Sequence, residues 1–264
     1  MVATIILTTV FVRSVITLPL AVYQNYILAK VENLQLVEMP EIVKELKRET
    51  AIAMKQFNWT EKEARMIYNR SLKKQWNNLI LRDNCHPFKA SILLWVQIPM
   101  WISISVAIRN LVYMLPHQDA AMVTYMEMSV GGFGWIPNLL IPDEALVLPV
   151  ALGLINLAIV ELQTMSKIRK DTKLQKYVTN LFRGLSLLMI PIAASVPSCL
   201  NLYWVTSSTY GLIQNLVLLS PKIKKLTKIP ETPSQLENPY KHIAAEIRNR
   251  AARIPTFWKS RVKN

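Results

Sequence analysis

Charged residues are scarce in this chain: they make up 18% of its 264 residues, whereas 52% are hydrophobic. In a soluble domain about a quarter of the residues are charged, so this balance argues against a domain folded around one core in water. The apolar residues gather in long blocks between charged stretches, as they do in chains that divide between lipid and water. The composition therefore predicts an integral membrane protein.

Enzyme signatures are also missing. The sequence has no H-E-x-x-H zinc motif, no nucleophile elbow and no phosphate-binding G-x-x-x-x-G-K loop, and its three histidines are scattered. We therefore expect no catalysis, no bound metal and no cofactor. The only cysteines are Cys85 and Cys199; the topology proposed below puts them on opposite sides of the membrane, where they cannot form a disulfide.

The net charge of +14 would favour a nucleic-acid partner if the protein were soluble. Here the basic residues lie beside the apolar blocks, so orientation in the membrane and attraction to anionic headgroups explain them better. The sequence contains no recognisable nucleic-acid-binding module. We therefore expect the protein to interact with the lipid bilayer and not with nucleic acid.

Apolar stretches long enough to cross a bilayer are expected to be helices, which rise about 1.5 Å per residue through about 30 Å of hydrocarbon. The last uncharged run, Gly184 to Ser220, is too long for one helix, and Pro197 with Ser198 divides it into two. We predict an all-α polytopic membrane protein with five transmembrane helices, at about residues 2–24, 88–112, 145–165, 177–196 and 199–219.

The charges of the connecting loops support this count. Residues 30–87 carry 11 Lys or Arg, residues 166–180 carry five and the tail from residue 220 carries eleven, whereas residues 113–144 carry none. Since basic loops stay on the inner side of a membrane, the N-terminus is predicted to face outside and the C-terminus inside.

The long inner loop has its own helical pattern. Thr60 and Glu63 match a capping box ahead of a helix that reaches about Arg82, and residues 40–57 match a partner helix. We predict an inner-side helical hairpin at residues 36–84, a membrane domain over residues 1–221 and a basic tail over residues 222–264 with a helix at about residues 240–253.

Arg13 is the most informative residue, because an arginine near the middle of a span costs about 2.5 to 3.5 kcal/mol on insertion scales. Thr9, Arg13 and Thr17 recur every four residues, so the first span has a polar stripe, which indicates a hydrated groove. No acidic residue lies at a comparable depth, since Glu161 is near the inner end of its helix. Polar positions of the other spans are expected to converge on this stripe: Gln97, Asn156, Asn201, Trp204 and Ser208.

Other interpretations of these residues remain open. Small and amide side chains also join membrane helices without further function, although that explanation is weaker for Arg13. A small-solute transporter or channel would also place an arginine in a wet path, but it would normally show a sequence repeat or paired ionisable groups. An assembly chaperone that moves no polypeptide is a third possibility.

Several segments resemble the YidC, Oxa and Alb family of membrane protein insertases, over nearly the whole chain. The matching residues are Val12-Arg13, Leu18-Pro19-Leu20, His86-Pro87-Phe88, Gln97-Ile98-Pro99-Met100-Trp101, Pro197, Leu202-Tyr203-Trp204 and Gln214. Residues 26–35 and 82–89 are similar to the mitochondrial branch that assembles cytochrome c oxidase. One departure is Pro197-Ser198-Cys199, where the family usually has Pro-x-Gly.

The resemblance implies a hydrophilic groove with Arg13 at its centre. The expected lining residues are Arg13, Thr9, Thr17, Gln97, Asn156, Asn201, Tyr203, Trp204 and Ser208. It implies an insertase of the mitochondrial inner membrane, with its N-terminus in the intermembrane space and its C-terminus in the matrix. The implied substrate is the acidic C-terminal tail of cytochrome c oxidase subunit 2, and the implied partners are that subunit and its assembly chaperones. The basic tail is shorter than the ribosome-binding extension of the general mitochondrial insertase, so we expect no direct ribosome docking.

Overall fold

The computed structural model describes residues 1–115, 118–167 and 172–261, which form helices joined by loops. The all-α class is therefore confirmed for these residues. The chain divides into two compact units. Unit 1 comprises Met1–Pro19, Val96–Ile223 and the residues from Leu236 on, and unit 2 comprises Leu20–Trp95 and Lys224–Gln235.

Four helices in the described part of the chain are long and apolar enough to cross a membrane. The first is one continuous helix, Val2–Gln56, so no break separates the predicted first span from the predicted hairpin. Its segments are α1 (Val2–Val12), the π-helical turn η1 (Arg13–Thr17), α2 (Leu18–Asn33), the π-helical turn η2 (Leu34–Glu38) and α3 (Met39–Gln56). The other three are η3 with α5 (Pro87–Ser91 and Ile92–Val112), α7 (Val147–Met165) and α8 (Lys173–Ala194).

A fifth long helix, α9 (Ser198–Leu219), follows α8 after a short turn that contains Pro197. The predicted break at this proline is confirmed. α9 is not among the four apolar helices, because polar residues such as Ser207, Ser208 and Asn215 lower its hydropathy. Nine of its residues are buried, so neighbouring helices shield much of its surface. The five-span count therefore remains a prediction.

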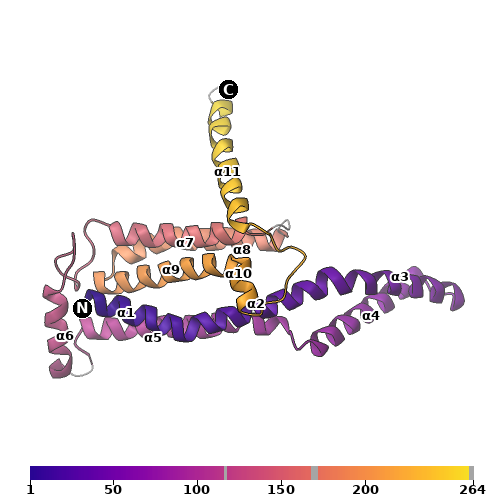
Figure 1. Cartoon of the computed structure of the whole chain (residues 1–264), viewed down its shortest axis with the longest axis horizontal. Helices are drawn as coiled ribbons and strands as arrows, with labels where there is room; N and C mark the ends of the chain where they lie inside the picture. Colours follow the sequence, from indigo (N-terminus) through magenta and orange to yellow (C-terminus); the bar gives the residue numbers. More distant parts are fainter. Residues whose placement is uncertain (116–117, 168–171, 262–264) are drawn as a thin grey trace. The chain divides into compact units, whose positions relative to one another are not determined.

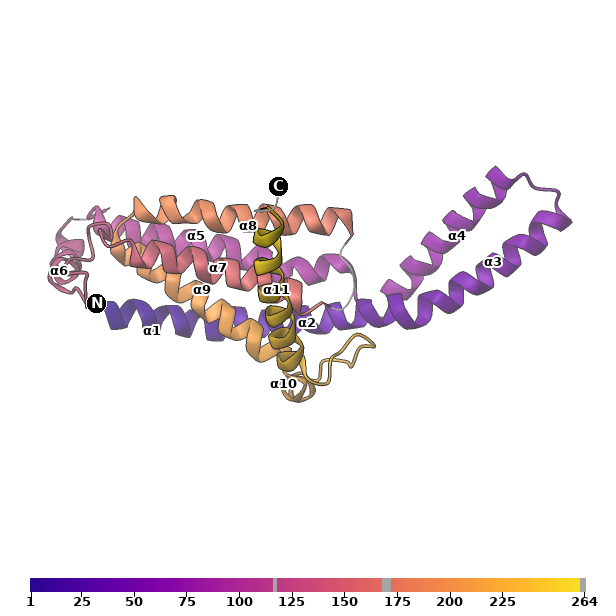
Figure 2. The same cartoon turned by 90° about the horizontal axis from the view of Figure 1, so that it is seen from above.

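Unit 1 is a bundle in which α7 packs against both α8 and α9, and α1 packs against α9. Both views show α7, α8 and α9 running side by side (Figures 1 and 2). Gly153 allows α7 to approach α8 closely, since a Cβ at this position would clash with the side chain of Ile190. The buried centre of the bundle includes Leu152, Tyr203 and Trp204.

The segment between α6 (Gln118–Val130) and α7 is held by Asp143, a carboxylate that is only 3% exposed. Its Oδ2 accepts a hydrogen bond from the backbone N–H of Leu148 at 2.8 Å. Its Oδ1 accepts from the backbone N–H of Ala145 and from Nε1 of Trp135, both at 3.2 Å. Asp143 therefore satisfies one free N–H group in the first turn of α7 and ties the loop to that helix.

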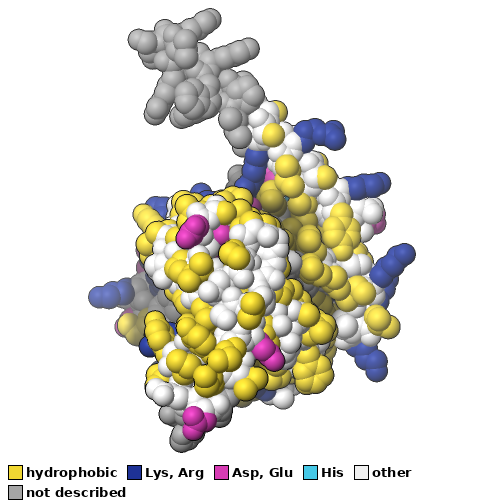
Figure 3. All heavy atoms as spheres, turned by 90° about the vertical axis from the view of Figure 1, so that its left-hand side faces the viewer, with side chains coloured by type: hydrophobic (Ala, Val, Ile, Leu, Met, Phe, Trp, Pro, Cys, Tyr) yellow, Lys and Arg dark blue, Asp and Glu magenta, His cyan; other side chains and the backbone are white. Residues whose placement is uncertain are grey.

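The same loop is joined to the first residues of α9. The backbone N–H of Ser198 donates to the carbonyl of Ile141 and that of Cys199 to the carbonyl of Leu139, both at 2.9 Å. Figure 3 looks at this end of the molecule, and its near face shows hydrophobic and acidic side chains with no lysine or arginine. This agrees with the absence of lysine and arginine from positions 113–144 of the sequence.

Unit 2 contains the predicted helical hairpin, formed by α3 and α4 (Glu61–Arg82). The predicted capping box is present: the Thr60 hydroxyl accepts from the backbone N–H of Glu63, and the Glu63 carboxylate accepts from the backbone N–H of Thr60. At the base of the hairpin, Nη2 of Arg82 donates to both carboxylate oxygens of Glu38, at 2.7 and 2.9 Å. The short helix α10 (Pro221–Leu226) lies at the start of the tail.

Cys85 lies in the buried core of unit 2, packed with Ile27, Leu34 and Leu79, and has no exposed surface. Burial raises the pKa of its thiol, so the reactive thiolate is less populated at neutral pH than in an exposed cysteine. We predict that a maleimide modifies Cys85 much more slowly than a cysteine introduced at the exposed Asn69, and faster as the pH rises. Mass spectrometry of the labelled chain measures both rates. Equal rates at pH 7 would contradict the burial of Cys85.

Candidate functional site

Arg13 begins the π-helical turn η1 and is buried, with 7% of its surface exposed. The turn is one residue wider than an α-helical turn, a distortion that is frequent at functional sites. It ends directly before Leu18-Pro19, where the proline has no N–H to continue the helical ladder. The hydroxyl of Thr17 donates to the carbonyl of Arg13 at 2.8 Å, which helps to satisfy the loosened backbone.

In the described part of the chain, the guanidinium of Arg13 forms hydrogen bonds with one neutral side chain, Ser207 of α9. Its Nε and Nη2 donate to the hydroxyl oxygen of Ser207, at 3.0 and 2.5 Å. Within residues 1–115, 118–167 and 172–261, no carboxylate forms an ion pair with Arg13. The positive charge is thus held in place by a hydroxyl, which does not neutralise it.

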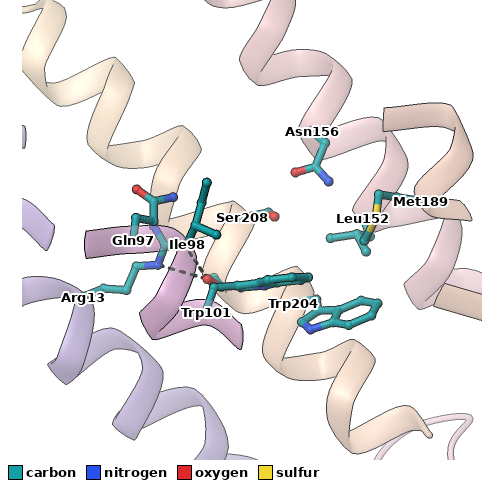
Figure 4. Close-up of a pocket in the computed structure, with 10 residues that line it drawn as sticks. Arg13, Gln97, Ile98, Trp101, Leu152, Asn156, Met189, Trp204 and Ser208 are labelled. Atoms are coloured by element: carbon teal, nitrogen blue, oxygen red, sulfur yellow. Dashed lines mark hydrogen bonds between the residues drawn. The ribbon is translucent and has the colours of Figure 1, made fainter. Parts of the chain in front are cut away.

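A cavity of about 280 Å³ lies beside Arg13. Figure 4 shows side chains from η1, α5, α7, α8 and α9 around it, with Arg13 and Gln97 on one side and Asn156 on the other. Its lining mixes polar with large apolar side chains: Arg13, Gln97, Ile98, Trp101, Leu152, Asn156, Met189, Trp204, Ser207 and Ser208. Such a space has enough polar partners to hold water next to the guanidinium.

Two tryptophans form a rigid part of this lining. The rings of Trp101 and Trp204 lie 5.3 Å apart between centroids with an interplanar angle of 33°. Nε1 of Trp204 donates to the hydroxyl of Ser105 on α5 at 2.9 Å. The ring contact and this hydrogen bond fix the position of α5 relative to α9 at the cavity.

The structure brings five of the nine predicted site residues to the cavity: Arg13, Gln97, Asn156, Trp204 and Ser208. The other four do not line it. Thr9 and Thr17 are buried in the first helix, where their hydroxyls donate to the carbonyls of Ile5 and Arg13. Tyr203 and Asn201 are buried in α9. Oδ1 of Asn201 has no hydrogen-bond partner in the described part of the chain.

Ser207 is the residue that the sequence pattern missed. The predicted polar face of α9 followed positions 201, 204 and 208, and position 207 belongs to the same face because it lies three residues after 204. A serine next to another serine offered no signal that it, and not its neighbour, would bind the arginine. Its role depends on how η1 packs against α9.

Glu161 does not pair with Arg13. It joins the tail helix to the bundle. Its Oε1 accepts from Nε of Arg183 on α8 at 2.6 Å, and its Oε2 accepts from Nη1 of Arg250 at 2.7 Å. Arg250 belongs to α11 (Pro239–Arg261), which begins near the predicted start of the tail helix and extends further. Ile243 of α11 is buried against apolar residues of α7 and α9.

We predict that Glu161→Gln loosens α11 from the bundle. Partly exposed ion pairs contribute about 1 kcal/mol, so local opening of the tail helix should become about fivefold more frequent. Hydrogen exchange of amides 243–250 measures this opening. Glu246→Gln is the matched control, because Glu246 pairs with Arg250 inside α11 and, in the described residues, forms no ion pair with the bundle. Equal protection in both variants would show that Glu161 does not hold the tail.

The chain matches a known protein family over most of its length. The model of the family described as 60Kd inner membrane protein matches residues 1–225. The chain is 48% identical over 241 residues to a Mus musculus protein named cytochrome c oxidase assembly protein COX18, mitochondrial, an alignment that covers 91% of this chain and 72% of that protein. The Homo sapiens protein of the same name is 47% identical with the same coverage. The mitochondrial inner membrane protein OXA1 of Arabidopsis thaliana is 29% identical over 61% of this chain and 35% of that protein.

Proposed function

Since the chain belongs to the 60Kd inner membrane protein family, the family of the YidC and Oxa1 insertases, we propose that it inserts protein segments into the mitochondrial inner membrane. Its substrate is the acidic C-terminal tail of cytochrome c oxidase subunit 2, which it moves from the matrix to the intermembrane space. In this way it aids assembly of the oxidase, complex IV. The names of the mouse and human relatives support the role in oxidase assembly.

The observation that carries the proposal is the buried Arg13 beside a partly polar cavity, with a hydroxyl as its hydrogen-bond partner. A buried charge in a protein is usually neutralised by a partner of opposite sign. Arg13 is instead positioned to attract an acidic group that arrives from outside the chain. Its place in a membrane helix makes a translocating acidic peptide the appropriate ligand.

The energetics of transfer fit this role. A polar segment that enters a hydrated cavity avoids much of the desolvation cost of crossing hydrocarbon, so the remaining apolar barrier is shorter. Because the matrix is electrically negative, outward movement of an acidic group gains about 2.3 kcal/mol per charge for each 100 mV. The membrane potential can therefore drive export without nucleotide hydrolysis.

The proposed topology follows the loop charges. α9 is the fifth span, the N-terminus lies in the intermembrane space, and the hairpin and the basic tail lie in the matrix. The hairpin guides or receives the substrate on the matrix side. The partners are subunit 2 with its assembly chaperones and the surrounding bilayer, and neither nucleic acid nor a ribosome is contacted directly.

Depletion of the protein from cells tests the proposal. We expect subunit 2 to accumulate with its C-terminal tail in the matrix, protected from protease added to mitochondria whose outer membrane has been opened. The tail should become accessible again when the wild-type chain is restored. Normal tail export with failed oxidase assembly would support a non-translocating chaperone instead. Solute flux through the purified chain in vesicles, together with normal tail export, would indicate a transporter or channel.

A further inference from the structure

The contact between Arg13 and Ser207 has an unusual form. Two nitrogens of one guanidinium, Nε and Nη2, donate to the same hydroxyl oxygen. Two donors on one acceptor fix the plane of the guanidinium as well as its position. Both residues are buried, at 7% and 2% exposure, so water competes little for these hydrogen bonds.

The remaining terminal nitrogen, Nη1, faces a position with no side chain. Gly211 lies four residues after Ser207 on α9, and a Cβ built there would be 3.8 Å from Nη1. Nη1 has no hydrogen-bond partner in the residues that the structure describes. One side of the guanidinium is therefore held by the protein, while Nη1 retains its donors for another group.

We propose that Ser207 is the positioning residue of Arg13, which orients Nη1 to bind a carboxylate of the translocating segment. The inference rests on the proposed function and adds to it a positioning residue, Ser207, and a preference for acidic segments. A serine suits this role because its hydroxyl orients the cation without neutralising it. An aspartate in the same place would bind Arg13 more strongly but would compete with the acidic substrate for it.

A purely structural role for Ser207 makes different predictions. In that case the serine would only join η1 to α9, and any side chain that preserves this link would suffice. A second side-chain hydrogen bond joins the same two segments without involving Arg13: Ser14 Oγ and Tyr210 Oη lie 2.9 Å apart. Tyr210→Phe therefore serves as the matched control, because it removes a link between these helices and leaves the contact of Arg13 with Ser207.

The test compares export of two forms of the subunit 2 tail by each variant: the natural acidic tail and a tail whose acidic residues are changed to amides. Because Ser207→Ala removes the hydrogen bonds that orient the charged guanidinium, it should reduce export of the acidic tail relative to the neutral tail by roughly tenfold. Ser207→Thr keeps the hydroxyl and should retain most of the preference. Ser207→Asp should abolish it, and Tyr210→Phe should leave it unchanged.

Export of the neutral tail within each variant corrects for differences in folding and abundance. The inference is wrong if Ser207→Asp exports the acidic tail normally, or if Ser207→Ala reduces both tails equally. Arg13→Ala separates this failure from failure of the proposed function. If Arg13→Ala loses acidic-tail export but the Ser207 variants do not, only the positioning role fails; if Arg13→Ala exports normally, the proposed function fails as well.

Discussion

Arg13→Ala is expected to reduce export of the acidic subunit 2 tail at least tenfold, while the chain stays folded in the membrane. The substitution removes the cation beside the cavity and leaves the hydroxyl of Ser207 without its donors. Loss of one charge-assisted contact of about 1.5 to 3 kcal/mol accounts for a change of this size. Protease accessibility of the tail from the intermembrane side, measured in cells that contain only the variant, gives the export yield.

Arg13→Lys should be intermediate, because an ammonium keeps the charge but lacks the planar guanidinium that contacts Ser207 through two nitrogens. Arg109→Ala is the matched control: Arg109 lies near the end of α5, is exposed and packs over the ring of Tyr113. It does not line the cavity, so its loss should change export less than twofold, as is usual for surface positions. Undiminished export by Arg13→Ala would refute the role of the cavity.

Asp143→Ala is expected to lower the stability of unit 1 by about 2 to 4 kcal/mol, because buried donors would lose their acceptor. The carboxylate accepts the backbone N–H of Leu148 in the first turn of α7, that of Ala145 just before the helix, and the indole N–H of Trp135. The loop that it holds also binds the first N–H groups of α9 through the carbonyls of Leu139 and Ile141. The damage should therefore reach both helices.

Thermal unfolding of the purified chain in detergent measures this effect. Glu144→Ala is the control, since it removes the neighbouring carboxylate, which is exposed. We expect a clear fall in the unfolding temperature for Asp143→Ala and little change for Glu144→Ala. Equal unfolding temperatures for the two variants would show that the capping hydrogen bonds of Asp143 contribute little.

Local features of the fold could be predicted from the sequence because their causes lie close together along the chain. The capping box of Thr60 and Glu63 was recognisable from residues three positions apart, and the break between α8 and α9 from Pro197. The boundary between the first span and the hairpin was not recognisable in this way. The helix runs on from Val2 to Gln56 through Pro19 and Pro40, because the π-helical turns η1 and η2 just before these prolines accommodate the missing backbone hydrogen bonds without ending the helix.

The candidate site was predictable in part. The regular spacing of Thr9, Arg13 and Thr17 identified the polar stripe, but only Arg13 of these three lines the cavity. Both threonine hydroxyls instead bind carbonyls of their own helix. Helical spacing predicts which side chains share a face, but it does not reveal which of them the neighbouring helices cover.

The sequence by itself determined the membrane class, the helical segments and the cost of burying Arg13, since these follow from hydropathy, spacing and charge along the chain. Only the tertiary structure decided that Ser207 binds Arg13 and that Glu161 binds Arg183 and Arg250. The residues of these contacts are far apart in the chain, by 194 positions for Arg13 and Ser207. Their pairing depends on how the helices pack, because a hydrogen bond requires its two atoms to meet within about 3 Å.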